Sequence, residues 1–207
     1  MAADKGALAA WMSGLASTLV NDTLDAQDLA SRLAKAPDLE GEAFAMELLS
    51  IMRVIAESVD APSGFDAILL PSGLDAATEA PANVLTAFGL AVAAPRVAWI
   101  SRPQARAARS RIASQGEAAL AVVAARGAEA VDLFRYLSRV IEIAVLIVSE
   151  QAANAVPIVR VETGISLPST VLAYHLYGDA ARAQGLVDIA RSTTPMLMPI
   201  AFDALES

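Results

Sequence analysis

The stretch that decides the fold is residues 158–202, IVRVETGISLPSTVLAYHLYGDAARAQGLVDIARSTTPMLMPIAF. Its first six residues alternate apolar and polar side chains, which is typical of a half-buried strand. Pro168 suits the first turn of a helix, Gly178 suits the C-cap of that helix, and Asp179 suits the N-cap of the next. Residues 197–202 can form a last strand, and their proline favours the edge of the sheet. The sequence therefore predicts a small α+β unit of strand, helix, helix and strand.

The chain ahead of this unit is predicted to be a helical body. Apolar residues recur at spacings of three and four over residues 8–19 and again over residues 44–59, as they do on the buried side of a packed helix. Several such helices within one short region imply a bundle. The predicted fold is mainly α, with a helical bundle over residues 1–155 followed by a small α+β unit over residues 156–207.

Two regions interrupt the helical pattern. Residues 61–82 carry prolines and glycines between short apolar pieces and are predicted to be an irregular connection. Residues 96–101, RVAWIS, fit a short strand or a bent helical turn equally well. Residues 104–154 are strongly helical with Gly116 and Gly127 as the breakers, so two long helices or one kinked helix are expected.

Composition restricts the kinds of partner. The net charge is −8, so the field of the whole molecule repels nucleic acid and acidic membrane surfaces. Hydrophobic residues make up 56% of the chain and charged residues only 18%, which leaves little polar surface for a monomer. We expect buried interfaces between copies of the chain, with a compact alanine-rich bundle as the alternative.

The chain offers little chemistry for catalysis or for cofactors. It has no Cys and one His, His175, which lies inside a predicted helix without a nucleophile in a recognisable motif. The carboxylates are scattered, and neither metal-ligand spacing nor a phosphate-binding loop is present. The longest apolar run, residues 140–149, contains Glu142 and is too short to span a membrane. We predict that the protein is not an enzyme, binds no metal or cofactor, and has no membrane span.

A cluster of arginines is the one candidate for contact with an anion. Arg102, Arg106, Arg109 and Arg111 lie within ten residues, and the first three share a helical face. Such a face can contact phosphate, DNA or an acidic partner. It can equally be a solvated face that pairs with carboxylates of this acidic protein.

The turn between the two predicted C-terminal helices is the candidate interaction site. Gly178 permits a left-handed turn and Asp179 caps the second helix, while Tyr174 and Tyr177 share roughly one helical face. Arg182 follows closely and can stack on a tyrosine ring or pair with Asp179. The corner can be a contact surface for a partner or an internal structural clasp.

These residues resemble the C-terminal end of the DNA circularisation proteins of Mu-like phages, a tail and baseplate family. The matching residues are Ala173, Tyr174, Leu176, Tyr177, Gly178, Asp179, Arg182, Pro195 and Pro199. The chain departs from the family pattern at Ile189-Ala190, Thr194 and Ile200-Ala201. The likeness covers the C-terminal half of the chain, with its motifs in the final quarter. The strand-helix-helix-strand order also resembles a LysM module.

The resemblance implies a non-enzymatic structural component of a contractile phage tail. Such a protein would be an adaptor in the baseplate, would contact hub and tube proteins and copies of itself, and would be located in the virion after assembly in the host cytoplasm. Two alternatives follow from the same likenesses. One is a DNA-end-binding protein that uses the arginine cluster, and the other is a peptidoglycan-binding module of LysM type.

Overall fold

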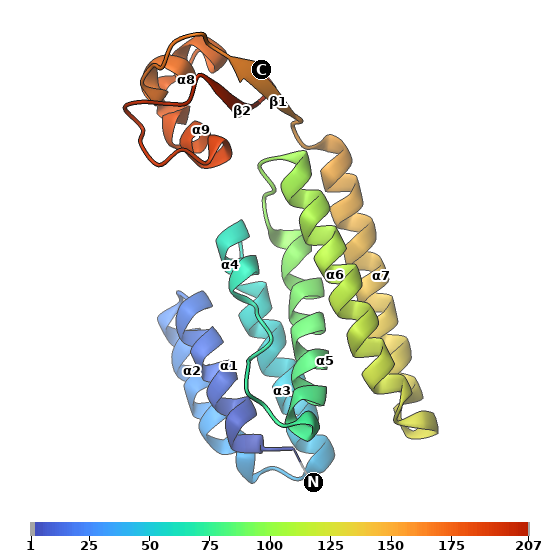
Figure 1. Ribbon diagram of the computed structural model, residues 1–207. Helices are drawn as coiled ribbons and strands as arrows, with labels where there is room; N and C mark the ends of the chain where they lie inside the picture. Colours follow the sequence, from blue (N-terminus) through green and yellow to red (C-terminus); the bar gives the residue numbers. More distant parts are fainter. Residues whose placement is uncertain (1–2, 207) are drawn as a thin grey trace. The chain divides into compact units, whose positions relative to one another are not determined.

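A computed structural model describes residues 3–206 (Figure 1). The chain forms two compact units. The N-terminal unit extends to Trp99 and continues over Arg106–Gln151, and the C-terminal unit consists of Ile100–Ala105 and the chain from Ala152 onward. The first unit is a bundle of helices, and the second combines helices with a two-stranded antiparallel sheet near the C-terminus. The predicted fold class, a helical bundle with a small α+β unit, is confirmed.

The N-terminal unit is built from amphipathic helices whose apolar stripes face one another. Its helices are α1 (Lys5–Leu19), α2 (Thr23–Lys35), α3 (Gly41–Glu57), α4 (Pro62–Ala67), α5 (Ala76–Ala93) and most of α6 (Arg102–Ala124) and α7 (Val131–Asn154). On α1 the predicted stripe is buried at Leu8, Met12 and Leu15. Asp22 caps α2, because its carboxylate accepts hydrogen bonds from the amides of the first turn.

Helix α5 lies at the centre of the bundle and packs against α3. Most of its residues are buried, whichever way they face. At Gly89 the two helices approach so closely that a Cβ atom would lie 2.8 Å from the sulfur of Met52 on α3. A helix that is apolar on all sides is one that is surrounded by others, and Figure 1 shows α5 between α3 and the α6–α7 pair.

The irregular connection predicted over residues 61–82 is wrong in part. The region contains α4 and the first turns of α5, and only residues 68–75 between them lack helix. Asp75 begins α5, because its Oδ1 accepts hydrogen bonds from the amides of Ala77 at 2.9 Å and Thr78 at 3.0 Å. Pro81 lies inside α5 near its N-terminus, where the missing N–H removes one helical hydrogen bond.

Residues 104–154 form two helices and not one kinked helix. The break is at Gly127, whose φ of +72° is left-handed and begins a short 3₁₀ turn, Gly127–Ala130. Gly116 does not break α6. It faces Ile141 on α7, where a Cβ atom would lie 3.0 Å from two side-chain carbons, so its role is close helix packing. Residues 96–101 were left undecided by the sequence. Arg96 ends a short 3₁₀ turn, Ala94–Arg96, and residues 97–101 form neither strand nor α-helix.

The C-terminal unit has the predicted order of elements, β1 (Ile158–Glu162), α8 (Ser169–Tyr177), α9 (Ala183–Ala190) and β2 (Ala201–Leu205). The strands pair antiparallel, with Ile158 opposite Leu205 and Glu162 opposite Ala201. A separate apolar core joins the helices to the sheet. It consists of the buried residues Leu172, Ala173, Leu186, Val187, Met198, Phe202 and Ala204.

The last strand lies later in the chain than predicted. Residues 197–202 were expected to form it, whereas β2 begins at Ala201. Pro199 has no N–H for a strand ladder. The amide of Met198 donates instead to the carbonyl of Leu167 at 3.1 Å, and its side chain is buried. The segment before Ala201 is therefore a loop held by the core, and the strand forms only after it.

Candidate interaction surface of the C-terminal unit

The corner between α8 and α9 is built as its sequence predicts. Gly178 has φ +70° and ψ 6°, which is the left-handed conformation that favours glycine, and its amide donates to the carbonyl of Tyr174 at 2.9 Å. Asp179 caps the 3₁₀ turn that leads into α9, because its Oδ1 accepts a hydrogen bond from the amide of Ala181 at 2.8 Å. Both residues serve the turn itself.

Tyr177 and Arg182 form a clasp inside the unit. The hydroxyl oxygen of Tyr177 accepts a hydrogen bond from the amide of Leu205 at 3.0 Å, which ties α8 to the last strand. The guanidinium carbon of Arg182 lies 4.0 Å from the centroid of the Tyr177 ring, so Arg182 stacks on that ring. Tyr174, by contrast, is 63% exposed. Of the predicted corner residues, Tyr174 is the one that presents a large apolar surface to solvent.

The clasp leads to a test with a matched control. Tyr177→Phe removes the acceptor of the Leu205 amide, and we expect the unfolding free energy of the C-terminal unit to fall by about 1–2 kcal/mol. Tyr174→Phe removes a hydroxyl from an exposed ring and is expected to change it by less than about 0.5 kcal/mol. Urea denaturation of both variants measures the difference. Equal effects would contradict the clasp.

Two loops of the unit run side by side and are joined by hydrogen bonds. One follows β1 over residues 163–168, and the other precedes β2 over residues 192–200. The bonds between the loops and the start of α8 are Thr163 N to Ile200 O at 2.9 Å, Ser166 Oγ to Met198 O at 2.6 Å, Met198 N to Leu167 O at 3.1 Å, and Ser169 N to Pro195 O at 2.7 Å. These four hydrogen bonds hold both loops in one arrangement.

These loops expose four large apolar side chains. Ile165 is 63% exposed, Met196 72%, Leu197 66% and Ile200 56%. We call these four residues the apolar loop surface. Sequence reasoning missed it, because residues 197–202 were assigned to a strand in which alternate side chains would be buried. The available signal was the run of apolar residues between two prolines, which cannot pair as a central strand.

The four arginines of the cluster are divided between the two units. Arg111 lies in the N-terminal unit, where its guanidinium donates to the carbonyls of Phe65 and Ile68 and to the Asp66 carboxylate and stacks on the Phe65 ring. Burial lowers the pKa of Arg111, and the nearby Asp66 carboxylate opposes this effect. These contacts engage Arg111 within the N-terminal unit and argue against the prediction that it contacts DNA or another anion.

The other three arginines of the cluster differ in surroundings. Arg102 belongs to the C-terminal unit, and its guanidinium donates to the carbonyl of Ala153 at 3.4 Å. Arg106 and Arg109 are exposed on the part of α6 that belongs to the N-terminal unit. Two exposed arginines within one unit are a small basis for binding a DNA end.

Neither a metal-binding cluster nor a membrane-spanning helix is found in the described part of the chain. Over residues 3–206 no three His, Asp or Glu side chains gather where they could hold a metal ion. None of the helices described there is both long and apolar enough to cross a membrane. His175 is exposed beside Tyr174, with 6.4 Å between the ring centroids.

Comparisons of the sequence with protein-family models and with curated proteins find no match. The resemblance to the Mu-like phage family therefore stays a prediction from the motif in residues 173–199.

Proposed function

We propose that the protein is a non-enzymatic assembly protein, an adaptor that joins hub and tube proteins in the baseplate of a contractile phage tail. The observation that carries the proposal is the apolar loop surface. The phage assignment rests on the sequence motif around Tyr174, Leu176 and Tyr177, and the adaptor role rests on the surface chemistry of the C-terminal unit.

The apolar loop surface has the properties of the centre of a protein interface. Such centres are apolar and poor in charge, and they are presented by backbone that moves little on binding. Here the loop residue between the exposed side chains, Met198, is fully buried and anchors the loop to the core. A partner can therefore bury Leu197 and Ile200 at a small cost in ordering the loops.

Helix α7 offers a second apolar surface, which supports self-association. Tyr136, Ile143 and Leu146 are 50%, 41% and 59% exposed. Tyr136 and Ile143 lie two turns apart on one side of the helix. Composition predicts buried interfaces between copies of the chain. Packing of copies through α7 would bury these side chains and account for part of the high apolar content.

The apolar loop surface argues against glycan binding, and the charge of the chain argues against DNA binding. A glycan site needs polar groups around a shallow groove, whereas these loops expose aliphatic side chains and prolines. DNA binding needs many phosphate contacts, and the chain has a net charge of −8 with Arg111 used internally. Binding of protein surfaces is the activity that the exposed residues favour.

Site-specific photocrosslinking tests the proposal. A photoreactive phenylalanine analogue at Leu197 is expected to crosslink the full-length protein to hub or tube proteins in purified phage particles, identified by mass spectrometry. The same analogue at Leu24, which is 74% exposed on α2, is the matched control and should not give these products. Leu197→Asp together with Ile200→Asp is expected to reduce incorporation into particles at least about tenfold, because burying a carboxylate at an apolar interface is strongly unfavourable.

Two results would overturn this function. One is absence of the protein from particles while it accumulates in the infected cell. The other is normal incorporation of the Leu197→Asp, Ile200→Asp variant. Retention of the protein on peptidoglycan, lost in the same variant, would favour the glycan-binding alternative instead.

A further inference from the structure

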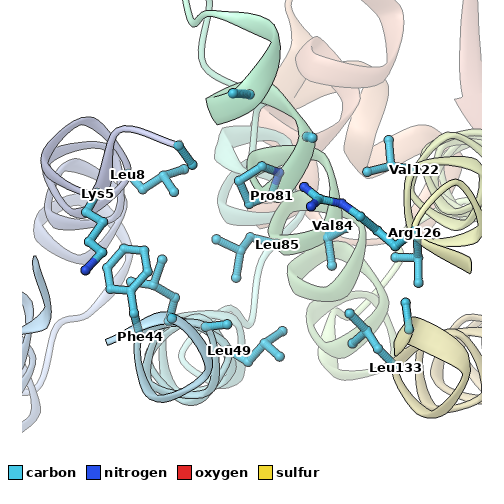
Figure 2. Close-up of a pocket in the computed structure, with 18 residues that line it drawn as sticks. Lys5, Leu8, Phe44, Leu49, Pro81, Val84, Leu85, Val122, Arg126 and Leu133 are labelled. Atoms are coloured by element: carbon cyan, nitrogen blue, oxygen red, sulfur yellow. The ribbon is translucent and has the colours of Figure 1, made fainter. Parts of the chain in front are cut away.

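The N-terminal unit contains an apolar pocket whose walls come from several of its helices. Its volume is about 530 Å³, within the range of about 300–1,000 Å³ that small-molecule sites occupy. Leu8 of α1, Phe44 of α3, Leu85 of α5 and Val122 of α6 contribute to it (Figure 2). All the lining residues except Lys5 and Arg126 are apolar or glycine.

The pocket is open to solvent, and residues of the core form its floor. Leu8 is 1% exposed, Leu48 2%, Leu85 4% and Val123 3%, yet each of these side chains lines the pocket. Protein interiors are normally packed with few voids larger than a water molecule. No side chain of residues 3–206 fills this volume. An apolar ligand would cover the part of the apolar lining that still faces solvent.

The two cations at the pocket differ in their availability. The Lys5 ammonium donates to the carbonyls of Leu39 and Pro37 and lies 5.5 Å from the centroid of the Phe44 ring, so it is engaged within the protein. Arg126 is exposed in the turn after α6, and among the described residues no carboxylate lies within ion-pairing distance of it. Figure 2 shows its guanidinium extended toward Pro81 and Val84 on the facing wall.

An apolar pocket with one available guanidinium is complementary to an apolar chain that ends in one carboxylate. Guanidinium and carboxylate form paired, charge-assisted hydrogen bonds. The volume of about 530 Å³ suits a ligand of small-molecule size, such as a single alkyl chain.

We propose that this pocket binds a single-chain anionic amphiphile of the fatty-acid class. Its carboxylate pairs with Arg126, and its chain lies between Phe44, Leu85 and Val122. This function is independent of the apolar loop surface, which belongs to the other unit. It gives the N-terminal unit a ligand that packs the walls between its helices.

Calorimetric titration of the full-length protein with decanoate tests the proposal. We expect one site per chain. Arg126→Gln is expected to weaken binding about tenfold or more, because it removes the charge-assisted pair. Arg109→Gln, which removes an exposed charge from α6 away from the pocket lining, is the matched control and should bind like the wild type. Decanol, which has the same chain without the charge, should bind more weakly and should not respond to Arg126→Gln.

A pocket-filling variant distinguishes the contribution of the apolar pocket to binding from that of the Arg126 charge. Val122→Trp places a ring in the open volume and is expected to abolish binding of both decanoate and decanol, while thermal unfolding shows that the bundle remains folded. Unchanged binding in both Arg126→Gln and Val122→Trp would overturn the proposal, as would many weak sites per chain. Binding to phosphatidylglycerol vesicles without binding of decanoate would overturn it in favour of a membrane surface.

Discussion

Phe202→Ala is expected to unfold the C-terminal unit while the helical bundle stays folded. Phe202 on β2 is 2% exposed and belongs to the small core with Leu172, Leu186 and Met198. Truncating a buried phenylalanine costs about 3–5 kcal/mol. A unit of this size has little stability in reserve, so a loss of this magnitude removes most or all of it.

Hydrogen exchange read by mass spectrometry measures this effect unit by unit. Peptides from α8 and α9 should lose protection in Phe202→Ala, and peptides from α3 and α5 should keep it. Leu197→Ala is the matched control, since Leu197 lies in the same unit but is 66% exposed, and it should change protection little. Simultaneous loss of protection in α3 and α5 would show that the two units do not unfold separately.

Arg111→Met is expected to destabilise the N-terminal unit by about 2–4 kcal/mol, because it leaves acceptors without their donor at a partly buried site. The guanidinium of Arg111 holds the C-terminal end of α4 by donating to the carbonyls of Phe65 and Ile68. It also stacks on Phe65, whose ring packs edge-on against Trp99 with 5.3 Å between centroids. The substitution keeps the bulk of the side chain and removes its charge and every donor.

Urea denaturation of three variants shows whether the lost unfolding free energy comes from the charge of Arg111 or from its hydrogen bonds. Arg109→Met, two residues earlier and exposed on α6, should stay within about 0.5 kcal/mol of the wild type. Arg111→Lys should recover only part of the stability, because a point charge cannot reach all the acceptors that the planar guanidinium spans. Full recovery of the unfolding free energy by lysine would mean that the positive charge, and not the set of hydrogen bonds from the guanidinium, stabilises α4.

Local patterns were sufficient wherever the decisive interactions lie close together in the chain. Gly178 and Asp179 bond to groups within four residues of themselves, so the corner they build is readable from sequence. The stripes of α1 and α3 are likewise a property of helical spacing. The cap at Asp75 was also local, and attention to it would have predicted the start of α5 despite Pro81.

Distant contacts decided the features that sequence reasoning got wrong. The carbonyl of Leu167 and the apolar core hold Met198 in a loop, and this moves the last strand to Ala201. Arg111 reads as one of four similar arginines, and only the folding of α4 against α6 makes it a structural residue.

By itself the sequence determined the class of fold, the helical stripes and the αL corner at Gly178, because these depend on backbone preference and short-range periodicity. Only the tertiary structure decided which side chains remain available to a partner or a ligand. Three features depend on which elements pack together although they are far apart in the sequence. They are the exposure of Leu197 and Ile200, the hydrogen bond from the Leu205 amide to Tyr177, and the pocket lined by Arg126. No local pattern in the chain specifies those separations.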